Sequence, residues 1–502
     1  MTTLPSGLPV VLDRGDGLPL AVQISAQLEA AVAGGVLRSG DRLPSSRDLA
    51  QVLGVSRTVV TNAYARLFAE GWLEGRHGSG TYVANVTSGT VADGMAGPAI
   101  GGTVGTAIGG AAGSTGAGTA SPVLPDDSRP LIELRPGISW ADGIDPAIWR
   151  RAWRQAGTRL PSMWPDPHGL PELRTEIAAY LRRSRGLTVP PEHVLVTQGV
   201  ANGLALLADA VVRPGDRVGV EEPGYPSARE VLCRAGAQVV PCRVDAHGVV
   251  PEDLPDDLRL LYTTPAHQYP LGGRLPVGRR QALISWARAT GALVVEDDYD
   301  SEFRYDVGPL PALYSMDPDV IVYLGTASKV LAAALGTGWL VAAPALVSRL
   351  AELRPRFAAR IPESVQHAFL ALLTSGDLER HIRKMRLEYG RRRAALVDTL
   401  TGQDAGHPCA SRPATDGSRF EPVPFRLLGD TAGMHVVLEL PDGYPAARLV
   451  DAAAARGVGI YTTDRYFAGP PALSGLILGY GTPTLPQVRR AAAELATLLT
   501  RV

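Results

Sequence analysis

Residues 320–329 read VIVYLGTASK, a run of apolar residues followed by the small polar residues Thr326 and Ser328 and then by Lys329. Such a run is typical of a buried strand in a parallel sheet, and ligands bind where such strands end. The chain has 49 Lys and Arg residues, yet reading the sequence finds only Lys329 and Lys384 as lysines. We therefore ask what Lys329 does that an arginine does not.

An arginine stays protonated, whereas a desolvated lysine loses its proton readily and forms Schiff bases with aldehydes. Lys329 is therefore a candidate for covalent chemistry, and the alternative is an ordinary surface lysine. Lys384 fits that alternative, because it lies in the arginine-rich stretch ERHIRKMRLEYGRRR (379–393), where any solvated charge would serve.

Composition restricts the class of protein. A chain of 502 residues is long enough for two or three domains. Its apolar runs are short and follow no charged leader, so we expect no membrane segment. Cys233, Cys242 and Cys409 form neither a disulfide framework nor a metal-ligand cluster, which favours a reducing cytoplasm and no metal site. Because the net charge is -1, any nucleic-acid binding must come from a local basic patch.

Residues 85–130 are dominated by Gly, Ala, Thr, Ser and Pro and contain no aromatic residue. A segment of this composition cannot bury enough apolar surface to offset its ordering entropy, so we predict a flexible linker with a typical reach of roughly 35 to 40 Å. It separates a small domain at 4–84 from a large domain at 131–502.

In the first domain, residues 19–34 carry apolar positions at helical spacing and end in two glycines. The stretch LPSSRDLAQVLGVSRTVVTNAYARLFAEGW (43–72) predicts two more helices, with a turn at Gly54 and caps at Ser45 or Ser46 and at Ser56. In the last helix, helical spacing predicts an inward stripe and a polar outward face. The inward residues are Val60, Ala63, Leu67 and Phe68, and the outward ones are Arg57, Thr58, Thr61, Asn62 and Arg66.

The stretch WLEGRHGSGTYVA (72–84) predicts two short strands around a His-Gly-Ser-Gly turn. A polar helix face alone is usually just solvated, but this order of parts resembles the GntR-type winged helix-turn-helix through GDRLPSSRDLA, GVSRTVVTNAYARL and GSGTYV. The resemblance implies binding of double-stranded operator DNA in the major groove, with the wing near the minor groove or backbone. The residues that it places at the DNA are Arg47, Ser56, Arg57, Thr58 and Thr61, with His77 and Gly78 at the wing tip.

From residue 131 onward, strand-like runs alternate with helical ones, which predicts an α/β domain with a mostly parallel sheet. Five runs end in polar residues, so their side chains converge on one crevice. These runs are HVLVTQG, DRVGVEEPGYP, RLLYTTPAHQYP, ALVVEDDYD and VIVYLGTASK.

A pyridine aldehyde held as a Schiff base needs three groups: a carboxylate at its ring nitrogen, a hydroxyl at its phenolic oxygen and a lysine at its aldehyde. Asp297, Tyr299 and Lys329 supply these groups. The phosphate of such a cofactor needs backbone amides at a helix start and nearby hydroxyls. The residues suited to that part of the site are Gly199, Val200, Ala201, Thr326 and Ser328, and Tyr225 is placed to stack on the ring.

The second domain resembles fold type I, aspartate-aminotransferase-like proteins that use pyridoxal 5'-phosphate (PLP), through WPDPHGLPELRTEIAAYLRRSRG and EDDYDSEFRY. Together with the first domain, the chain resembles MocR/GabR-type transcriptional regulators. This resemblance implies a smaller C-terminal α+β subdomain, PLP on Lys329, and a head-to-tail homodimer that senses PLP or a small amino compound. It also implies an aminotransferase-like domain used as a sensor.

Four positions depart from the pattern of that family. Gly336 stands where an arginine usually grips the phosphate, and Val200 replaces a phosphate-binding hydroxyl. Tyr269 stands where aminotransferases have an asparagine at the phenolic oxygen. Ile477 stands where they hold the substrate carboxylate with an arginine, a role that Arg465 in a nearby loop is expected to take over. Two alternatives therefore stay open: an active aminotransferase with an appended DNA-binding domain, and a regulator that has lost PLP.

Overall fold

The computed structural model describes residues 10–15, 18–70, 72–76, 80–84, 131–305, 311–357, 361–402, 424–429 and 431–499. The predicted linker at 85–130, the wing-tip residues His77 and Gly78, and Cys409 lie outside these residues. The limits predicted for the three segments of the chain therefore stay predictions.

The N-terminal domain has the predicted helices and wing. Ser45 caps α2, its hydroxyl accepting a hydrogen bond from the Asp48 amide at 3.2 Å. Gly54 ends that helix with a left-handed backbone at φ 61°, which a glycine adopts without strain. A short strand, β1, joins the two wing strands in an antiparallel sheet ordered β1-β3-β2. The elements are α1 (Leu20–Ala33), β1 (Arg42–Leu43), α2 (Ser46–Leu53), α3 (Arg57–Glu70), β2 (Leu73–Arg76) and β3 (Gly80–Val83).

Two predicted orientations on α3 are wrong. Val60, Ala63 and Leu67 are buried as expected, but Phe68 is 39% exposed. Arg66 was expected on the outward face, yet only 6% of its surface is exposed, and it pairs with Glu70 at 2.9 Å. The helix has a second covered face because Val277 of the large domain packs into the core of the winged domain. The helical periodicity of one domain's sequence does not show that a second domain packs against the helix.

The large domain has an eight-stranded sheet ordered β5-β12-β11-β10-β9-β6-β7-β8, in which β9, β10, β11, β6 and β7 run parallel. The five predicted strands are all present, and β12 is inserted antiparallel between β5 and β11. The strands are β5 (Val194–Thr197), β6 (Arg217–Glu222), β7 (Gln238–Asp245), β8 (Gly248–Val249), β9 (Leu260–Thr263), β10 (Leu293–Asp298), β11 (Ile321–Thr326) and β12 (Gly338–Val341).

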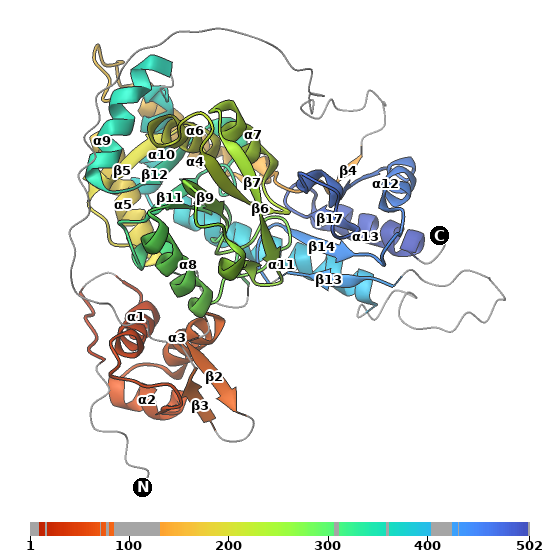
Figure 1. Ribbon diagram of the computed structural model, residues 1–502, viewed down its shortest axis with the longest axis horizontal. Helices are drawn as coiled ribbons and strands as arrows, with labels where there is room; N and C mark the ends of the chain where they lie inside the picture. The colour runs from red at the N-terminus through yellow and green to blue at the C-terminus, as the bar shows by residue number, and fades with distance from the viewer. Residues whose placement is uncertain are drawn as a thin grey trace, which may run out of the picture.

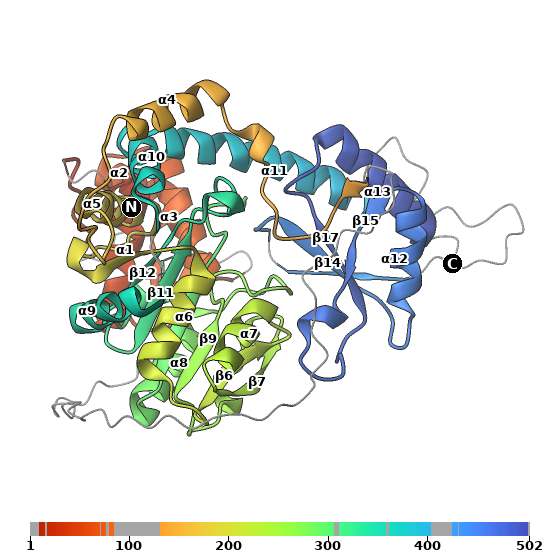
Figure 2. The same cartoon turned by 90° about the horizontal axis from the view of Figure 1, so that it is seen from above.

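Helices cover both faces of this sheet, as the alternation of strands and helices predicts (Figures 1 and 2). Leu204, Leu232 and Leu350, from α6, α7 and α9, share one hydrophobic core. Helices α5, α8 and α10 contribute to the other core. The helices are α4 (Pro146–Gly157), α5 (Pro171–Arg185), α6 (Val200–Val211), α7 (Pro226–Arg234), α8 (Val277–Thr290), α9 (Pro344–Leu353) and α10 (Glu363–Thr374).

The C-terminal part is the expected smaller α+β subdomain, built on a four-stranded antiparallel sheet ordered β13-β14-β17-β16. Strand β4, at the start of the aminotransferase-like region, pairs parallel with β15 in this subdomain. The elements are β4 (Ile132–Glu133), α11 (Asp377–Thr401), β13 (Arg426–Leu428), β14 (His435–Glu439), α12 (Ala446–Ala455), β15 (Val458–Gly459), β16 (Tyr461–Thr462), β17 (Gly475–Gly479) and α13 (Leu485–Leu499).

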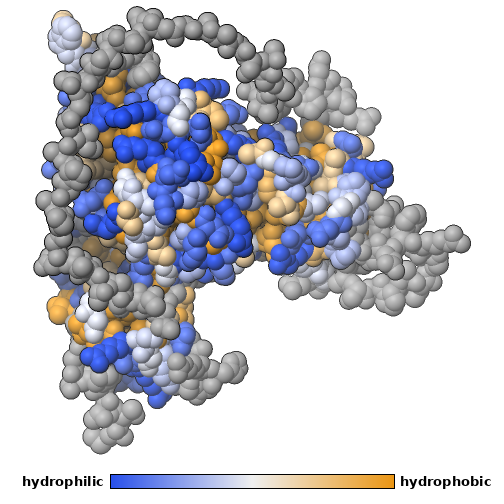
Figure 3. All heavy atoms as spheres, viewed as in Figure 1, coloured by the Kyte–Doolittle hydropathy of each residue, from blue (hydrophilic) through white to orange (hydrophobic). Residues whose placement is uncertain are grey.

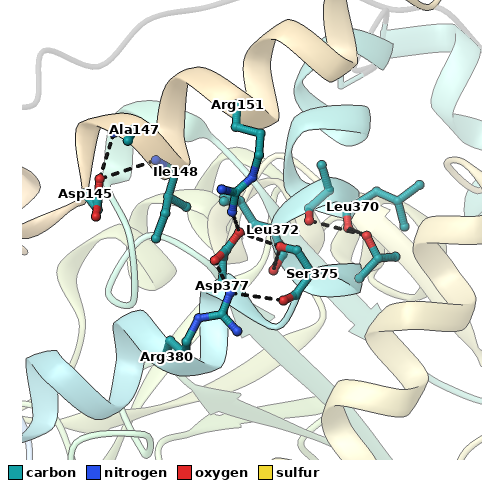
Figure 4. A network of polar contacts seen from close by, with 11 residues as sticks. Asp145, Ala147, Ile148, Arg151, Leu370, Leu372, Ser375, Asp377 and Arg380 are labelled. Carbon is teal, nitrogen blue, oxygen red and sulfur yellow. Dashed lines mark hydrogen bonds and ion pairs between the residues drawn. The ribbon is translucent and has the colours of Figure 1, made fainter.

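Helix α11 runs from the large domain into the small subdomain (Figure 2). Its first residue, Asp377, is 3% exposed and accepts hydrogen bonds from Arg151 of α4, from Arg380 and, at 2.6 Å, from the Ser375 hydroxyl (Figure 4). These contacts hold the pKa of Asp377 below its usual value although burial raises it. The carboxylate therefore fixes the start of α11 against α4.

None of the helices in the described residues is long and apolar enough to span a bilayer. The described residues also contain no group of three or more His, Cys, Asp or Glu side chains that could hold a metal ion.

Candidate functional site

A pocket of 370 Å³ opens at the ends of the parallel strands. Its lining includes every residue that the sequence predicts at a cofactor site: Tyr225, Tyr269, Asp297, Tyr299, Thr326, Ser328, Lys329, Gly199, Val200 and Ala201. These residues come from segments up to 130 positions apart, and the parallel sheet brings them together at one edge. The volume lies within the roughly 300 to 1,000 Å³ that is typical of small-molecule sites.

Lys329 projects into the pocket from the turn after β11, and its Nζ donates a hydrogen bond to the Gly137 carbonyl at 2.6 Å. Burial lowers the pKa of the lysine, while Asp300 and Asp297 act in the opposite direction. A lowered pKa increases the fraction of neutral amine, which is the form that attacks an aldehyde.

Asp297 is the last residue but one of β10 and is 4% exposed. Its Oδ2 accepts a hydrogen bond from the Tyr262 hydroxyl, but its buried Oδ1 has no hydrogen-bond partner in the described residues. Burial raises the pKa of Asp297 to about 7, and the Tyr262 hydrogen bond opposes this rise. A buried carboxylate oxygen without a partner is costly, so Oδ1 is suited to a ligand that brings a proton, such as a pyridinium nitrogen.

The part of the pocket that the sequence predicts for a phosphate consists of backbone and hydroxyl groups. Helix α6 begins at Val200 after Gly199, whose φ is 83°, and no side chain caps its first amides. Across the pocket the Thr326 hydroxyl donates to the Ser328 hydroxyl at 2.9 Å. Amides at a helix start and two hydroxyls form a suitable anion site without an arginine.

Gly336, the position of the missing arginine, does not line the pocket. It follows the short 3-10 turn Ala333–Leu335 with φ 56° and ψ 43°, a left-handed backbone, and a Cβ built on it would meet open space. The glycine is therefore explained by the turn that the chain makes here, where an arginine would be strained.

The three tyrosines that line the pocket form one aromatic cluster with Tyr466. Tyr225 and Tyr269 meet edge to face with centroids 6.0 Å apart, and Tyr269 also packs edge to face against Tyr299 and Tyr466. The Tyr299 hydroxyl lies 2.9 Å from His267 Nδ1, which in turn contacts Asp300 at 3.0 Å. This network fixes the position of the Tyr299 hydroxyl. The sequence had indicated no role for His267.

Arg465 is not brought into the pocket. It lies on the 3-10 turn Asp464–Tyr466, is exposed, and stacks on the Tyr461 ring with its Cζ 3.8 Å from the centroid. Ile477 is fully buried in β17 beside Tyr466 and Tyr269. No arginine is found among the described residues that line the pocket.

Four lining residues were missed by sequence reasoning: Pro136, Gly137, Gln198 and Thr264. Thr264 follows strand β9 and Gln198 follows strand β5. Both were predictable, because ligands bind where parallel strands end. Gly137 contributes a backbone carbonyl from a segment 192 positions before the lysine, for which the sequence gives no signal.

On the winged domain, all five predicted DNA-contacting residues that the structure describes lie at the surface. Arg57, Thr58 and Thr61 share the exposed side of α3, and Ser56 precedes it. Arg57 Nε donates to the Ser46 hydroxyl at 3.3 Å, so this arginine lies beside the start of α2. The placement agrees with a DNA-binding face, while the role of each residue stays a prediction.

Comparison with known proteins finds two family models on the chain. The model "Bacterial regulatory proteins, gntR family" matches residues 20–83, and "Aminotransferase class I and II" matches 144–415. Among solved structures, an archaeal alanine:glyoxylate aminotransferase has a TM-score of 0.65 at 24% identity, over 73% of this chain and 90% of that one. This likeness shows the fold of the second domain.

Curated relatives match nearly the whole chain. The pyridoxine biosynthesis transcriptional regulator PdxR of Corynebacterium glutamicum is 36% identical over 97% of this chain and 98% of its own. The probable rhizopine catabolism regulatory protein MocR of Rhizobium meliloti is 32% identical over 94% and 92%. This chain therefore belongs to the family of transcriptional regulators in which a GntR-type DNA-binding domain is joined to an aminotransferase-like domain.

Proposed function

We propose that this regulator binds PLP as a Schiff base on Lys329 and changes its operator DNA binding in response. The observation that carries the proposal is the unpartnered, buried Oδ1 of Asp297 in the same pocket as the lysine amine. When bound, PLP supplies an aldehyde that captures amines. Asp297 holds the ring nitrogen, Lys329 the aldehyde carbon, and the start of α6 with Thr326 and Ser328 the phosphate.

Tyr225 and Tyr299 complete the proposed cofactor site. Tyr225 stacks on the ring, and Tyr299, fixed by His267, donates its hydroxyl to the phenolic oxygen. Tyr269 takes the place of the aminotransferase asparagine as a wall of the pocket. The relative named for regulation of pyridoxine biosynthesis supports PLP itself as the effector, since PLP is the phosphorylated aldehyde of that vitamin. A small amino compound that reacts with bound PLP is the other effector within this proposal.

We propose sensing rather than catalysis because the pocket offers no guanidinium to a substrate carboxylate in its described lining. A transaminase must hold each substrate in one orientation for proton transfer, and a bidentate arginine is the usual means. The exposed Arg465 stacks on Tyr461 outside the pocket lining, and we keep it as the candidate contact for an effector.

We further propose that the protein is a homodimer in the cytoplasm, where its operator lies. Large apolar side chains near α4 are exposed in the single chain, including Leu160, Met163 and Trp164, each at 85% or more. A groove of 520 Å³ beside Trp149 and Trp153 adds further apolar surface. Figure 3 shows hydrophobic residues at the surface among the hydrophilic ones. Exposed apolar surface of this extent is typical of protein–protein interfaces.

Spectroscopy of the purified protein with added PLP tests the proposal. A visible absorbance that borohydride abolishes, and a changed affinity for promoter DNA when PLP is added, are the expected results. No reducible absorbance would refute the cofactor assignment. Repeated turnover of an amino acid with a keto acid would refute the sensor assignment and favour an aminotransferase.

A further inference from the structure

A buried histidine–aspartate pair, His267 and Asp300, lies beside the pocket. His267 is 3% exposed and Asp300 is 2% exposed. The His267 Nδ1 atom lies 3.1 and 3.0 Å from the two carboxylate oxygens of Asp300, and 2.9 Å from the Tyr299 hydroxyl. Tyr299 lines the pocket, whereas the other two residues are not part of its described lining. The pair therefore touches the pocket through Tyr299.

The partners of His267 decide where its hydrogen lies. An ionised carboxylate only accepts hydrogen bonds, and it is a stronger acceptor than a phenol oxygen. Nδ1 therefore carries a hydrogen and donates it to Asp300, whatever the state of the second ring nitrogen. A ring nitrogen that carries a hydrogen has no lone pair with which to accept one. The Tyr299 oxygen thus faces an N–H group, and the Tyr299 hydrogen must point to another acceptor.

The Tyr299 hydroxyl keeps its hydrogen at ordinary pH. Burial raises the pKa of this hydroxyl well above its usual value, and the neighbouring titratable groups add to the rise: Asp300, Tyr269, Asp297 and Glu221. Among the described residues, His267 is the one hydrogen-bond partner of the hydroxyl. The remaining direction for its hydrogen is the pocket that Tyr299 lines.

Backbone from the small subdomain holds the pair in place. Gly433 has φ 76°, and a Cβ built on it would lie 2.1 Å from His267 Cε1 and 2.8 Å from Asp300 Oδ2, so only a glycine fits at this position. The Gly433 carbonyl accepts hydrogen bonds from the Tyr305 and Tyr480 hydroxyls at 2.6 and 2.7 Å. This fixed backbone packs directly against the histidine and the carboxylate.

A second histidine packs against the first. The ring centroids of His435 and His267 are 5.4 Å apart, and His435 Nε2 donates to the Pro270 carbonyl at 2.8 Å. Burial lowers the pKa of His435 to about 4, and His267 adds to the fall. His435 is therefore neutral at ordinary pH and does not compete with His267 as a cationic partner of Asp300.

We propose that Asp300 and His267 form a positioning pair that makes Tyr299 a hydrogen-bond donor toward the pocket. Asp300 holds the Nδ1 hydrogen of the histidine, the N–H group faces the Tyr299 oxygen, and the Tyr299 hydrogen is directed at the phenolic oxygen of PLP. The proposal rests on the proposed binding of PLP. It adds the direction of the Tyr299 hydrogen bond and the two residues that set it.

A donor at the phenolic oxygen changes how readily the Schiff base nitrogen on Lys329 holds a proton. The phenolic oxygen carries more negative charge once that nitrogen has lost its proton, because the two atoms share the proton while it is present. A hydroxyl that donates to the oxygen therefore stabilises the deprotonated form and lowers the pKa of the nitrogen. The negative charges of Asp300 and Asp297 act in the opposite direction at Lys329.

A pH titration of the visible absorbance of bound PLP, in the full-length protein, tests the pair. Tyr299→Phe should raise the midpoint by about one to two pH units, the equivalent of one charge-assisted hydrogen bond. His267→Leu should raise it by a similar amount, because no N–H group then faces the Tyr299 oxygen and its hydrogen is drawn to the Asp300 carboxylate. His267→Asn should keep a midpoint close to the native one, since the amide nitrogen takes the place of Nδ1 as donor.

His193→Leu is the matched control. His193 Nδ1 lies 3.2 Å from the Tyr314 hydroxyl, so this change also breaks a contact between a histidine and a tyrosine. Neither residue belongs to the described lining of the pocket. The control should leave the midpoint unchanged.

Double variants separate the positioning effect from the effect of charge. With Tyr299→Phe already present, His267→Leu should cause no further shift. Asp300→Asn removes a negative charge near Lys329, so in the Tyr299→Phe protein it should lower the midpoint. With Tyr299 present, the new amide is a weaker acceptor and frees Nδ1 to accept the Tyr299 hydrogen. The midpoint should then lie about one pH unit above the value expected from the charge effect alone.

Equal shifts for Asp300→Asn with and without Tyr299, or an unchanged midpoint in His267→Leu, would overturn the proposal and leave the proposed function intact. If His267→Leu fails to fold, the Asp300→Asn comparison decides by itself. A native protein with no borohydride-reducible absorbance would instead refute PLP binding, and this proposal with it.

Discussion

Replacement of Asp297 by asparagine should change stability and cofactor affinity in opposite directions. The carboxyl is 4% exposed, and burial raises its pKa from 3.8 to about 7. A folded-state pKa above the unfolded value means that ionisation destabilises the fold, so the ligand-free protein loses stability as pH rises from about 4 through about 7. The pKa difference corresponds to a ceiling of roughly 4 kcal/mol.

Asp297→Asn removes this cost, since the amide oxygen can still accept the Tyr262 hydrogen bond. We expect the ligand-free variant to be more stable than the native protein by up to roughly 4 kcal/mol at pH 8, and by only about 1.6 kcal/mol at pH 5, which lies about 1.2 pH units above the unfolded pKa. The same change removes the counter-charge of the pyridinium. PLP affinity should therefore fall about 10- to 150-fold, the equivalent of about 1.5 to 3 kcal/mol for a charged hydrogen bond.

Urea unfolding at the two pH values and absorbance titration with PLP provide the measurements. Glu296→Gln is the control, because Glu296 is buried on the same strand but faces away from the pocket, where it accepts from the Leu313 and Tyr314 amides. It should leave PLP affinity unchanged. An Asp297→Asn protein with unchanged PLP affinity, or with no gain in stability at pH 8, would refute the argument.

Three further predictions concern the cofactor lysine, the phosphate end and the DNA-binding face. Lys329→Ala should abolish the borohydride-reducible absorbance and leave the circular dichroism spectrum unchanged; retained reducible absorbance would exclude Lys329 as the site. Gly336→Arg should cost about 1 to 2 kcal/mol of stability because of its left-handed backbone, and should leave PLP affinity unchanged in titration; tighter binding would show that this turn reaches the phosphate. Arg47→Ala and Arg57→Ala should each weaken operator binding, measured by fluorescence anisotropy across a salt series. The loss should be about 1 to 3 kcal/mol if the arginine contacts a base. If it contacts a phosphate, the slope of log affinity against log salt concentration should fall by about one. Unchanged operator affinity and unchanged salt dependence in both variants would show that the DNA-binding face lies elsewhere.

The sequence determined what depends on local order along the chain. Each strand that borders the pocket is visible in the sequence as an apolar run. The polar residues that follow such a run lie at the edge of the sheet where parallel strands end. The positions of Asp297, Lys329 and the start of α6 were therefore predictable. The helices and the wing of the first domain follow from helical period, caps and glycine turns in the same way.

The tertiary structure decided which groups from distant segments meet these residues. The Gly137 carbonyl reaches Lys329 and the Tyr262 hydroxyl reaches Asp297 only because the chain returns to the same sheet edge. Arg66 has the sequence pattern of an outward-facing residue, yet it is buried close to Gly186 of the large domain and pairs with Glu70. Periodicity identifies the faces of a helix, but whether water, DNA or another domain covers a polar face depends on contacts between residues far apart in the chain.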